Sequence, residues 1–258
     1  MAHASTSPLR AAQQELLAQL IDHGLLLPSG VAGVYGRGAM FEEVLSRFMS
    51  FVTRSTASDS PTHVHFPPVM SRQHMEKTHY LESFPQLAGL VYSFEGDDAE
   101  HRRFSDMVQS GEDWSAIPNR TEVALAAAAC HPLYPTCAGR LPPRGRIFDL
   151  TSYCFRHEPS DDPARMQMFR MREHVRMGRP DDVRAWRDTW IERGLSMVEA
   201  LGLPAYVAPA SDPFFGRTGR MLAANQRQQA LKFEIVLPIT SSEHPTATDP
   251  SPRSRTGC

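Results

Sequence analysis

Charged residues gather in one segment of the chain, Phe155 to Gly178, in a pattern that suits binding of a polyphosphate. An extended run ends in Arg156-x-Glu158, a polar loop with two prolines follows, and a second extended run carries Arg170. Each guanidinium offers directed, charge-assisted hydrogen bonds to phosphate oxygens. Positive charge held at this point would stabilise the negative charge that develops on a phosphoryl group as pyrophosphate leaves. The alternative is an exposed hairpin with surface ion pairs, which contribute little to stability.

The whole segment resembles motif 2 of the class II aminoacyl-tRNA synthetases, and most of all that of the seryl enzymes. The resemblance implies that Arg156 contacts the α-phosphate of ATP and the carboxylate of the amino acid. It also implies that Glu158 binds the adenine amino group and that Arg170 holds the γ-phosphate. The family stacks adenine on an aromatic ring four positions after that arginine, and His174 occupies this position here.

Cys130 and Glu173 narrow the resemblance to one branch of this family. Atypical, zinc-dependent seryl enzymes and the amino acid:[carrier protein] ligases use a Cys, a Glu and a second Cys to bind zinc. Three protein ligands leave Zn²⁺ an exchangeable position, where the metal selects a free amine and orients its carboxylate toward ATP. Taken alone, Cys130 is more often a small buried hydrophobic residue. Cys137 and Cys154 match no family ligand, so we interpret both as structural.

Helical and extended patterns surround these residues. Apolar side chains recur at helical spacing over residues 11–26, 41–54 and 182–201, with a glycine-rich break over 30–38. Strands are expected over residues 146–156, 167–175 and 231–239, with a short extended segment over 63–68. Helices interspersed with strands joined by short loops indicate an α+β fold with an antiparallel sheet. The resemblance implies the same fold, a class II synthetase-like antiparallel sheet flanked by helices.

The helix over 41–54, the extended segment after it and Pro67-Pro68 resemble motif 1 of the class II enzymes. This element builds their dimers, so the resemblance implies a homodimer. Within the extended segment, His63-x-His65 puts two imidazoles on one face of a strand, and imidazole binds metal. No third ligand is apparent in the sequence, and we interpret this pair as structural.

The composition is that of an ordinary globular enzyme. The chain has 258 residues, of which 41% are hydrophobic and 22% charged, and its formal net charge is −2. Such a balance gives no overall positive field for a nucleic-acid backbone. No run of 18 apolar residues is present, and the N-terminus lacks a basic-then-apolar signal pattern. We therefore expect a cytoplasmic protein without a membrane span.

The stretch before motif 1 separates two interpretations of the function. Ordinary seryl enzymes carry a long coiled-coil arm there that binds tRNA, whereas here motif 1 begins near residue 40 after one short helix. No basic patch or RNA-binding module replaces the arm, so no tRNA partner is expected. The resemblance thus points to the carrier-protein ligases. They activate glycine or alanine as an aminoacyl-adenylate and transfer it to the phosphopantetheine thiol of a small acidic carrier.

The segment from Asp212 to Arg227 has the form of a docking surface for such a carrier. Pro213 suits the start of a helix, and Arg217, Arg220 and Arg227 offer positive charge to an acidic partner. The family places its carrier-binding helix between motifs 2 and 3, which agrees with this stretch. The alternative is a solvated helix face without a partner.

The resemblance stops near Ala247. Lys232 to Pro238 resembles the strand before the family's metal-binding acidic residue, for which Glu243 is the candidate, and Mg²⁺ is expected as a cofactor together with ATP and zinc. Residues 248–258 contain two prolines and no aliphatic or aromatic residue, a composition typical of disorder. We expect an incomplete catalytic domain over 1–247, with the last strands, motif 3 and the second zinc cysteine missing. The tail over 248–258 would then be disordered or the product of a frameshift.

Three hypotheses on function remain at this point. The first is an ATP- and zinc-dependent ligase acting on a small amino acid and a carrier protein. The second is a zinc-dependent enzyme similar to seryl-tRNA synthetase, and the third is a catalytically inactive binding paralogue that lacks motif 3. The sequence does not decide between glycine and alanine, because one methyl group changes binding by only about 1–3 kcal/mol.

Overall fold

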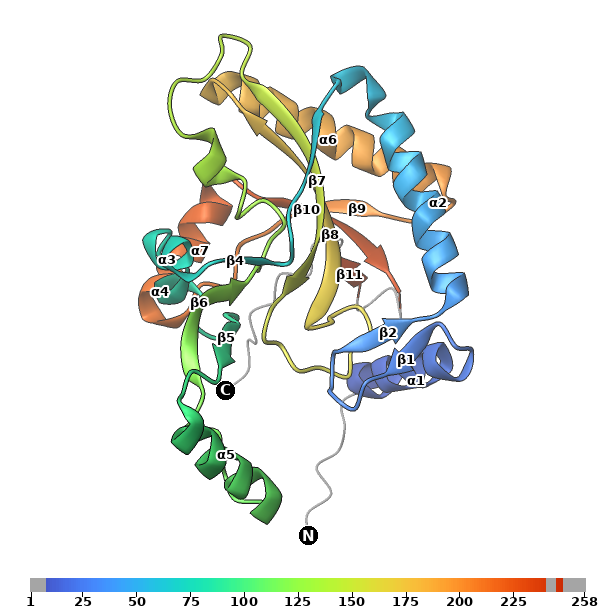
Figure 1. The fold of residues 1–258 in the computed structure, drawn as a ribbon. Coiled ribbons are helices and arrows are strands. Elements are labelled where there is room, and N and C mark those ends of the chain that lie inside the picture. The colour runs from blue at the N-terminus through green and yellow to red at the C-terminus, as the bar shows by residue number, and fades with distance from the viewer. Residues whose placement is uncertain (1–7, 240–244, 248–258) are drawn as a thin grey trace.

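A long antiparallel hairpin forms the centre of the structure, a computed structural model that describes residues 8–239 and 245–247 (Figure 1). Its strands are β7 (Arg146–Phe155) and β8 (Met168–Met177), which pair along their whole length. β3 (Thr62–His65) pairs with β7 in parallel orientation, so the sheet order is β3-β7-β8. The predicted hairpin of the antiparallel sheet is confirmed, and β3 adds a parallel strand at its edge.

Two helices pack on one face of this sheet, α2 (Ala39–Ser55) and α6 (Pro180–Ala200). Both confirm helices predicted from apolar spacing. α6 begins with Pro180, whose missing amide hydrogen costs nothing in the first helical turn. Two aspartates follow it in that turn, where negative charge interacts favourably with the helix dipole.

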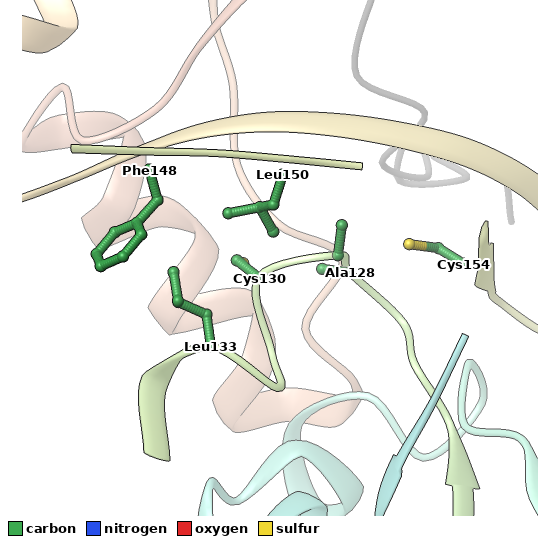
Figure 2. Close-up of a cluster of buried hydrophobic side chains, with 7 residues drawn as sticks. Ala128, Cys130, Leu133, Phe148, Leu150 and Cys154 are labelled. Carbon is green, nitrogen blue, oxygen red and sulfur yellow. The ribbon is translucent and has the colours of Figure 1, made fainter. Parts of the chain in front are cut away.

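The opposite face of the hairpin packs on a segment that covers residues 126–133. Figure 2 shows Phe148 and Leu150 of β7 pointing toward Cys130 and Leu133 of that segment, and these side chains belong to one buried cluster. Partly buried residues of β8 complete the cluster from the other strand. The two strands therefore have one face toward this core and one face toward α2 and α6.

The N-terminal part consists of α1 (Pro8–Asp22) and a small hairpin of β1 (Leu26–Pro28) and β2 (Tyr35–Arg37). The helix predicted over 11–26 therefore ends earlier than expected. Its end is set by Gly24, which adopts φ +66° while the amides of Gly24 and its neighbour bond back to the last turn of α1. The predicted glycine-rich break contains β2.

A second, antiparallel sheet has the order β4-β6-β5. The elements of this part are β4 (Val69–Ser71), α3 (Arg72–Lys77), α4 (Tyr80–Ser83), β5 (Leu90–Ser93), α5 (Asp98–Ser110) and β6 (Asn119–Leu125). α5 projects from the body of the molecule (Figure 1) and begins with a capping box between Asp97 and Glu100. The sequence predictions omit this helix, although its capping box is a recognised start signal.

The third sheet has the order β11-β10-β9. Its elements and the helix between them are β9 (Tyr206–Pro209), α7 (Gly216–Gln228), β10 (Phe233–Pro238) and β11 (Pro245–Ala247). β10 confirms the strand predicted over 231–239. The prediction that a helix starts at Pro213 is wrong, because α7 begins at Gly216 with Phe215 as its N-cap.

Two short 3₁₀ helices, Ala57–Asp59 and Tyr134–Cys137, complete the described elements. None of the helices in the described ranges combines the length and hydropathy of a membrane-spanning segment. Glu243 and the predicted tail over 248–258 lie outside the described residues.

Candidate active site

Cys130 and Glu173 meet on the core-facing side of the β7–β8 hairpin. The backbone amide of Cys130 donates a hydrogen bond to Glu173 Oε2 at 2.6 Å. Cys130 is 8% exposed and belongs to the buried cluster of Figure 2, with Leu150 directly opposite Glu173 in the strand register. The structure thus brings together the two residues that the sequence suggested as metal ligands. We call this side of the hairpin the Cys130 face.

The electrostatics at Cys130 favour the neutral thiol when no metal is bound. Burial raises the pKa of the Cys130 thiol, and the Glu173 carboxylate beside it raises the pKa further. Burial likewise raises the pKa of Cys154 to about 12, with a smaller contribution from Glu173. Zinc binds the thiolate, so binding at Cys130 must release a proton.

The donor types at this site suit zinc, because thiolate and carboxylate are among its ordinary ligands. In the part of the chain that the structure describes, no third His, Cys, Asp or Glu joins Cys130 and Glu173 in a metal-binding group. Cys137 packs at the edge of the buried cluster, and Cys154 lies within it. The pair therefore fits two positions of a zinc site, and the described residues leave the rest of its ligand set open.

Arg156 lies on the same face, at the end of β7. Its Nε donates to Ala127 O at 3.1 Å, and its guanidinium lies over the Phe169 ring, 5.5 Å from the centroid. Phe169 itself packs against the buried cluster that contains Cys130. A fixed cation and an aromatic ring thus lie on the same strand face as the Cys130–Glu173 pair, nearer the loop end of the hairpin.

The charge of Arg156 acts on the buried groups around it. The pKa of His131 is lowered to about 4, chiefly by burial and further by the charges of Arg156 and His74. Burial raises the pKa of the half-buried Glu158, while the nearby guanidiniums of Arg165 and Arg156 partly oppose this shift. Arg156, Glu158 and Arg165 are therefore electrostatic neighbours at one end of the hairpin.

Arg170 and His174 lie on the opposite side, which we call the α2 face. Arg170 Nη2 donates to Glu42 Oε1 of α2 at 2.6 Å. The His174 side chain is 4% exposed, and its ring lies 4.5 Å from the Trp190 ring of α6. Strand side chains alternate between faces, so residues 170 and 174 point away from residue 173. Arg170 is therefore paired with α2 and His174 is packed against α6, both on the face opposite Cys130.

Arg165 and Phe169 are a second pair of residues with this spacing, which the sequence interpretation did not consider. The spacing used for Arg170 and His174, an arginine followed four positions later by a ring, also occurs at Arg165 and Phe169. Counting back four positions from Glu173 places Phe169 on the same strand face. The alternation of side chains between the two faces of β8 is the signal that distinguishes the Arg165–Phe169 pair from the Arg170–His174 pair.

The α2 face contains a buried ion network. Arg172 donates to both carboxylate oxygens of Asp149, at 2.9 and 2.6 Å, and to Met49 O of α2. His63 Nδ1 lies 3.2 Å from the same carboxylate, which agrees with the structural role expected for it. This network attaches α2 to the strands that carry the site.

The three arginines suggested for carrier binding are exposed on or near the surface of α7. Apolar side chains stand beside them, with Met221 70% exposed and Leu222 46% exposed. The helix is held in place by Gly219, where a Cβ would lie 2.6 Å from the Phe214 backbone. Arg217, Arg220 and Arg227 are thus presented to solvent together with an apolar patch on a fixed helix.

Two curated proteins of Bradyrhizobium diazoefficiens are similar to the chain over most of its length. Amino acid–[acyl-carrier-protein] ligase 1 is 41% identical over 244 residues, covering 94% of this chain and 73% of the relative. Amino acid–[acyl-carrier-protein] ligase 2 is 40% identical over 248 residues, covering 95% and 73%. No protein-family model matches the sequence.

Solved structures with the same fold include two seryl-tRNA synthetases. One is the M. kandleri enzyme in complex with A. aeolicus tRNASec, with a TM-score of 0.72 at 16% identity, covering 90% of this chain. The other is the cytoplasmic enzyme of Naegleria fowleri in complex with AMP, with a TM-score of 0.61 at 15% identity, covering 91%. The chain spans 48% and 46% of their lengths. These likenesses confirm the class II synthetase-like α+β fold.

Proposed function

Because the chain belongs to the amino acid–[acyl-carrier-protein] ligase family, we propose that it activates a small amino acid with ATP and transfers it to a carrier protein. In the first step, a carboxylate oxygen of the amino acid attacks the α-phosphate, and pyrophosphate leaves. In the second, the phosphopantetheine sulfur of the carrier attacks the carbonyl carbon, and AMP leaves. The observation that carries the proposal is the Cys130–Glu173 contact on the same face of the hairpin as Arg156.

Arg156 is proposed to bind the α-phosphate and the amino-acid carboxylate. A guanidinium at this point neutralises charge on both reacting groups and stabilises the charge that develops as pyrophosphate leaves. Its bond to Ala127 O supports the role, because it fixes the guanidinium before ATP arrives. Glu158 is proposed to accept a hydrogen bond from the adenine amino group.

We assign the adenine stack to Phe169 and the γ-phosphate contact to Arg165, in place of His174 and Arg170. Support comes from the position of Phe169, whose ring lies next to the Arg156 guanidinium on the Cys130 face. A phenyl ring also stacks on a base more effectively than a buried imidazole already packed on Trp190. Glu243 remains the proposed ligand of the ATP-bound Mg²⁺, outside the described residues.

Cys130 and Glu173 are proposed to hold zinc, which would offer a Lewis-acid position to the substrate amine. The two side chains fix where the amine lies relative to Arg156, so that the carboxylate points at the α-phosphate. Leu133, Phe148 and Leu150 surround Cys130 with bulky apolar groups, which supports a small amino acid. We propose glycine or alanine as the substrate.

The α7 surface is proposed to dock the carrier. Electrostatic attraction of an acidic partner to the helix would come from Arg217, Arg220 and Arg227. The apolar contact area would come from Met221 and Leu222. The same helix joins β9 to β10.

The chain is further proposed to act as a homodimer through α2. Met40, Val44 and Phe48 recur every fourth residue along this helix and are 65%, 61% and 41% exposed. The other side of α2 is bound to the hairpin through Arg170 and Arg172. An apolar stripe left in water on a helix of this kind supports a protein interface.

Amino-acid-dependent exchange of labelled pyrophosphate into ATP tests the activation step, with glycine, alanine and serine compared. Transfer is then measured to a carrier with phosphopantetheine, to the same carrier without it, and to tRNA. The proposal expects exchange with glycine or alanine and loading of the modified carrier alone. Exchange with serine and loading of tRNA would replace it by a seryl-tRNA synthetase-like function, and absence of exchange would indicate a binding paralogue.

A further inference from the structure

The loop between β7 and β8, residues 156–167, is held from outside by the N-terminal part of the chain. This part, α1 with the β1–β2 hairpin, contributes no residue to the chemistry proposed above. In Figure 1 it lies at the end of the β7–β8 hairpin where the loop turns. We propose that it is a positioning element, here called the N-terminal brace, that keeps the loop in the conformation needed for ATP. The inference rests on the proposed function only in assigning ATP to that loop.

The first contact joins α1 to two aspartates of the loop. Gln13 Nε2 donates to Asp162 Oδ2 at 2.8 Å, and Gln14 Nε2 donates to Asp161 Oδ2 at 3.0 Å. Arg10 Nη2 lies 3.2 Å from the same Asp161 oxygen. Residues 10, 13 and 14 share one side of a helix, so α1 presents a polar face to the loop.

Charge strengthens this contact. Hydrogen bonds from Gln14 and then Arg10 lower the pKa of the Asp161 carboxyl, so it stays ionised at neutral pH. A charged acceptor forms a stronger hydrogen bond than a neutral one. The loop therefore has a definite anchor at its exposed turn, and not only at the two strand ends.

The second contact runs from the β1–β2 turn to Arg156 through Gln167. The Gln167 residue is 4% exposed; its Nε2 donates to Ala32 O at 2.7 Å, and its backbone amide donates to Gly33 O at 2.6 Å. Its own carbonyl accepts the Arg156 amide at 2.9 Å, and its Oε1 lies 3.1 Å from His157 Nδ1. A continuous chain of hydrogen bonds thus links the turn to the arginine at the reacting phosphate.

Gly33 is required for this approach. It has φ +77°, and a Cβ there would lie 3.1 Å from Gln167 Cγ and 3.2 Å from its backbone nitrogen. A side chain at this position would be strained and would push the turn away from the loop. The close backbone contact between the β1–β2 turn and Gln167 therefore requires glycine at position 33.

A brace of this kind acts through the population of the competent loop conformation. A polar loop with free conformations must be ordered when ATP binds, which reduces affinity. The apparent dissociation constant rises in inverse proportion to the fraction of molecules whose loop is already competent. Chemistry after binding is unaffected, so the brace changes KM for ATP and leaves kcat nearly constant.

The test compares Gln13→Ala/Gln14→Ala with a matched control, Glu15→Ala, on the exposed side of α1. Among the described residues, Glu15 accepts a side-chain hydrogen bond from Gln19 of the same helix. Two quantities are measured: the kinetic constants for ATP in pyrophosphate exchange, and the rate of trypsin cleavage after Arg165 without ATP. We expect the double variant to raise KM for ATP about fivefold, with kcat within about twofold, and to speed cleavage by a similar factor. The control should match the wild type.

Asp161 provides a second pair of variants from the loop side. Asp161→Asn retains one acceptor oxygen for Gln14 and should restore most of the protection that Asp161→Ala loses. Unchanged cleavage in both Gln13→Ala/Gln14→Ala and Asp161→Ala would overturn the brace. The cleavage assay needs no catalysis, so absence of exchange in the wild type would contradict the proposed function and leave the result on the brace separate.

Discussion

Cys130 and Glu173 are 43 residues apart in the sequence, yet the Cys130 amide and the Glu173 carboxylate are joined by a hydrogen bond of 2.6 Å. The contact forms because the segment after β6 folds across the face of the hairpin, where Cys130 enters the buried cluster. It puts a thiol and a carboxylate together on the hairpin face that also carries Arg156. The predictions that follow test this site, its supports and its docking surface.

Phe169→Ala should raise KM for ATP about tenfold, because stacking of a base on an aromatic ring is worth ~1–3 kcal/mol. Phe169→Tyr keeps the ring and should remain within about twofold of the wild type. His174→Gln changes the α2 face and should leave KM for ATP close to the wild-type value. Steady-state pyrophosphate exchange with varied ATP measures all three. A larger effect on KM from His174→Gln than from Phe169→Ala would instead support adenine stacking on His174 and the γ-phosphate contact of Arg170.

Asp149→Ala should destabilise the fold by about 3 kcal/mol, because it leaves the buried Arg172 without its charge partner. Urea unfolding followed by circular dichroism gives this difference. The control is Glu43→Ala, which removes an exposed ion pair with Arg47 and should unfold close to the wild-type midpoint. Equal midpoints for Asp149→Ala and the wild type would show that this ion pair does not stabilise the fold.

Stability should fall as the pH drops from about 6.5 toward 4, in part because of His131. Its pKa is about 4 in the folded state, lowered by burial and then by Arg156 and His74, against 6.5 for the ordinary side chain. Between these values the unfolded chain binds a proton that the folded chain does not, so unfolding is favoured as pH decreases. His131→Asn cannot take up that proton and should show a shallower slope. Urea midpoints at pH 5 and pH 7.5 measure it, and equal slopes would exclude His131 as the source.

Arg217→Glu/Arg220→Glu should raise KM for the carrier protein about tenfold, since it replaces attraction by repulsion at the docking helix. Pyrophosphate exchange should remain unchanged, because α7 takes no part in adenylate formation. Arg103→Glu/Arg184→Glu, at two exposed arginines of α5 and α6, changes the net charge by the same amount and serves as the control. Carrier kinetics that respond equally to both variants would point to overall charge and not to α7.

The sequence predicts those helices and strands that are long enough to repeat their apolar pattern several times. The β7–β8 hairpin and α2 extend over enough residues for alternation and the apolar stripe to identify them. β1 and β2 have three residues each, too few for a pattern, and only their pairing defines them. α5 has a capping box, but its apolar stripe is limited to Phe104, Met107 and Val108, which is shorter than the stripe of α2.

Within the site, Cys130 and Glu173 are recognisable from the sequence. The sequence does not show which of two aromatic rings, Phe169 or His174, is available to adenine. Two arginine-to-ring spacings overlap between Arg165 and His174. The choice between them depends on which strand face each ring occupies, and the occupants of the α2 face come from distant segments. Long-range contacts such as Arg170 with Glu42 cannot be read from local patterns.

The most direct test of the site is the zinc content of the purified protein, measured together with amino-acid-dependent pyrophosphate exchange in the same sample. We expect about one zinc per chain in the wild type, loss of both zinc and exchange in Glu173→Ala and in Cys130→Ser, and retention of both in Cys137→Ser. Circular dichroism of each variant establishes that it is folded. Stoichiometric zinc in folded Glu173→Ala would contradict the assignment of this carboxylate, and with it the proposed site for the substrate amine.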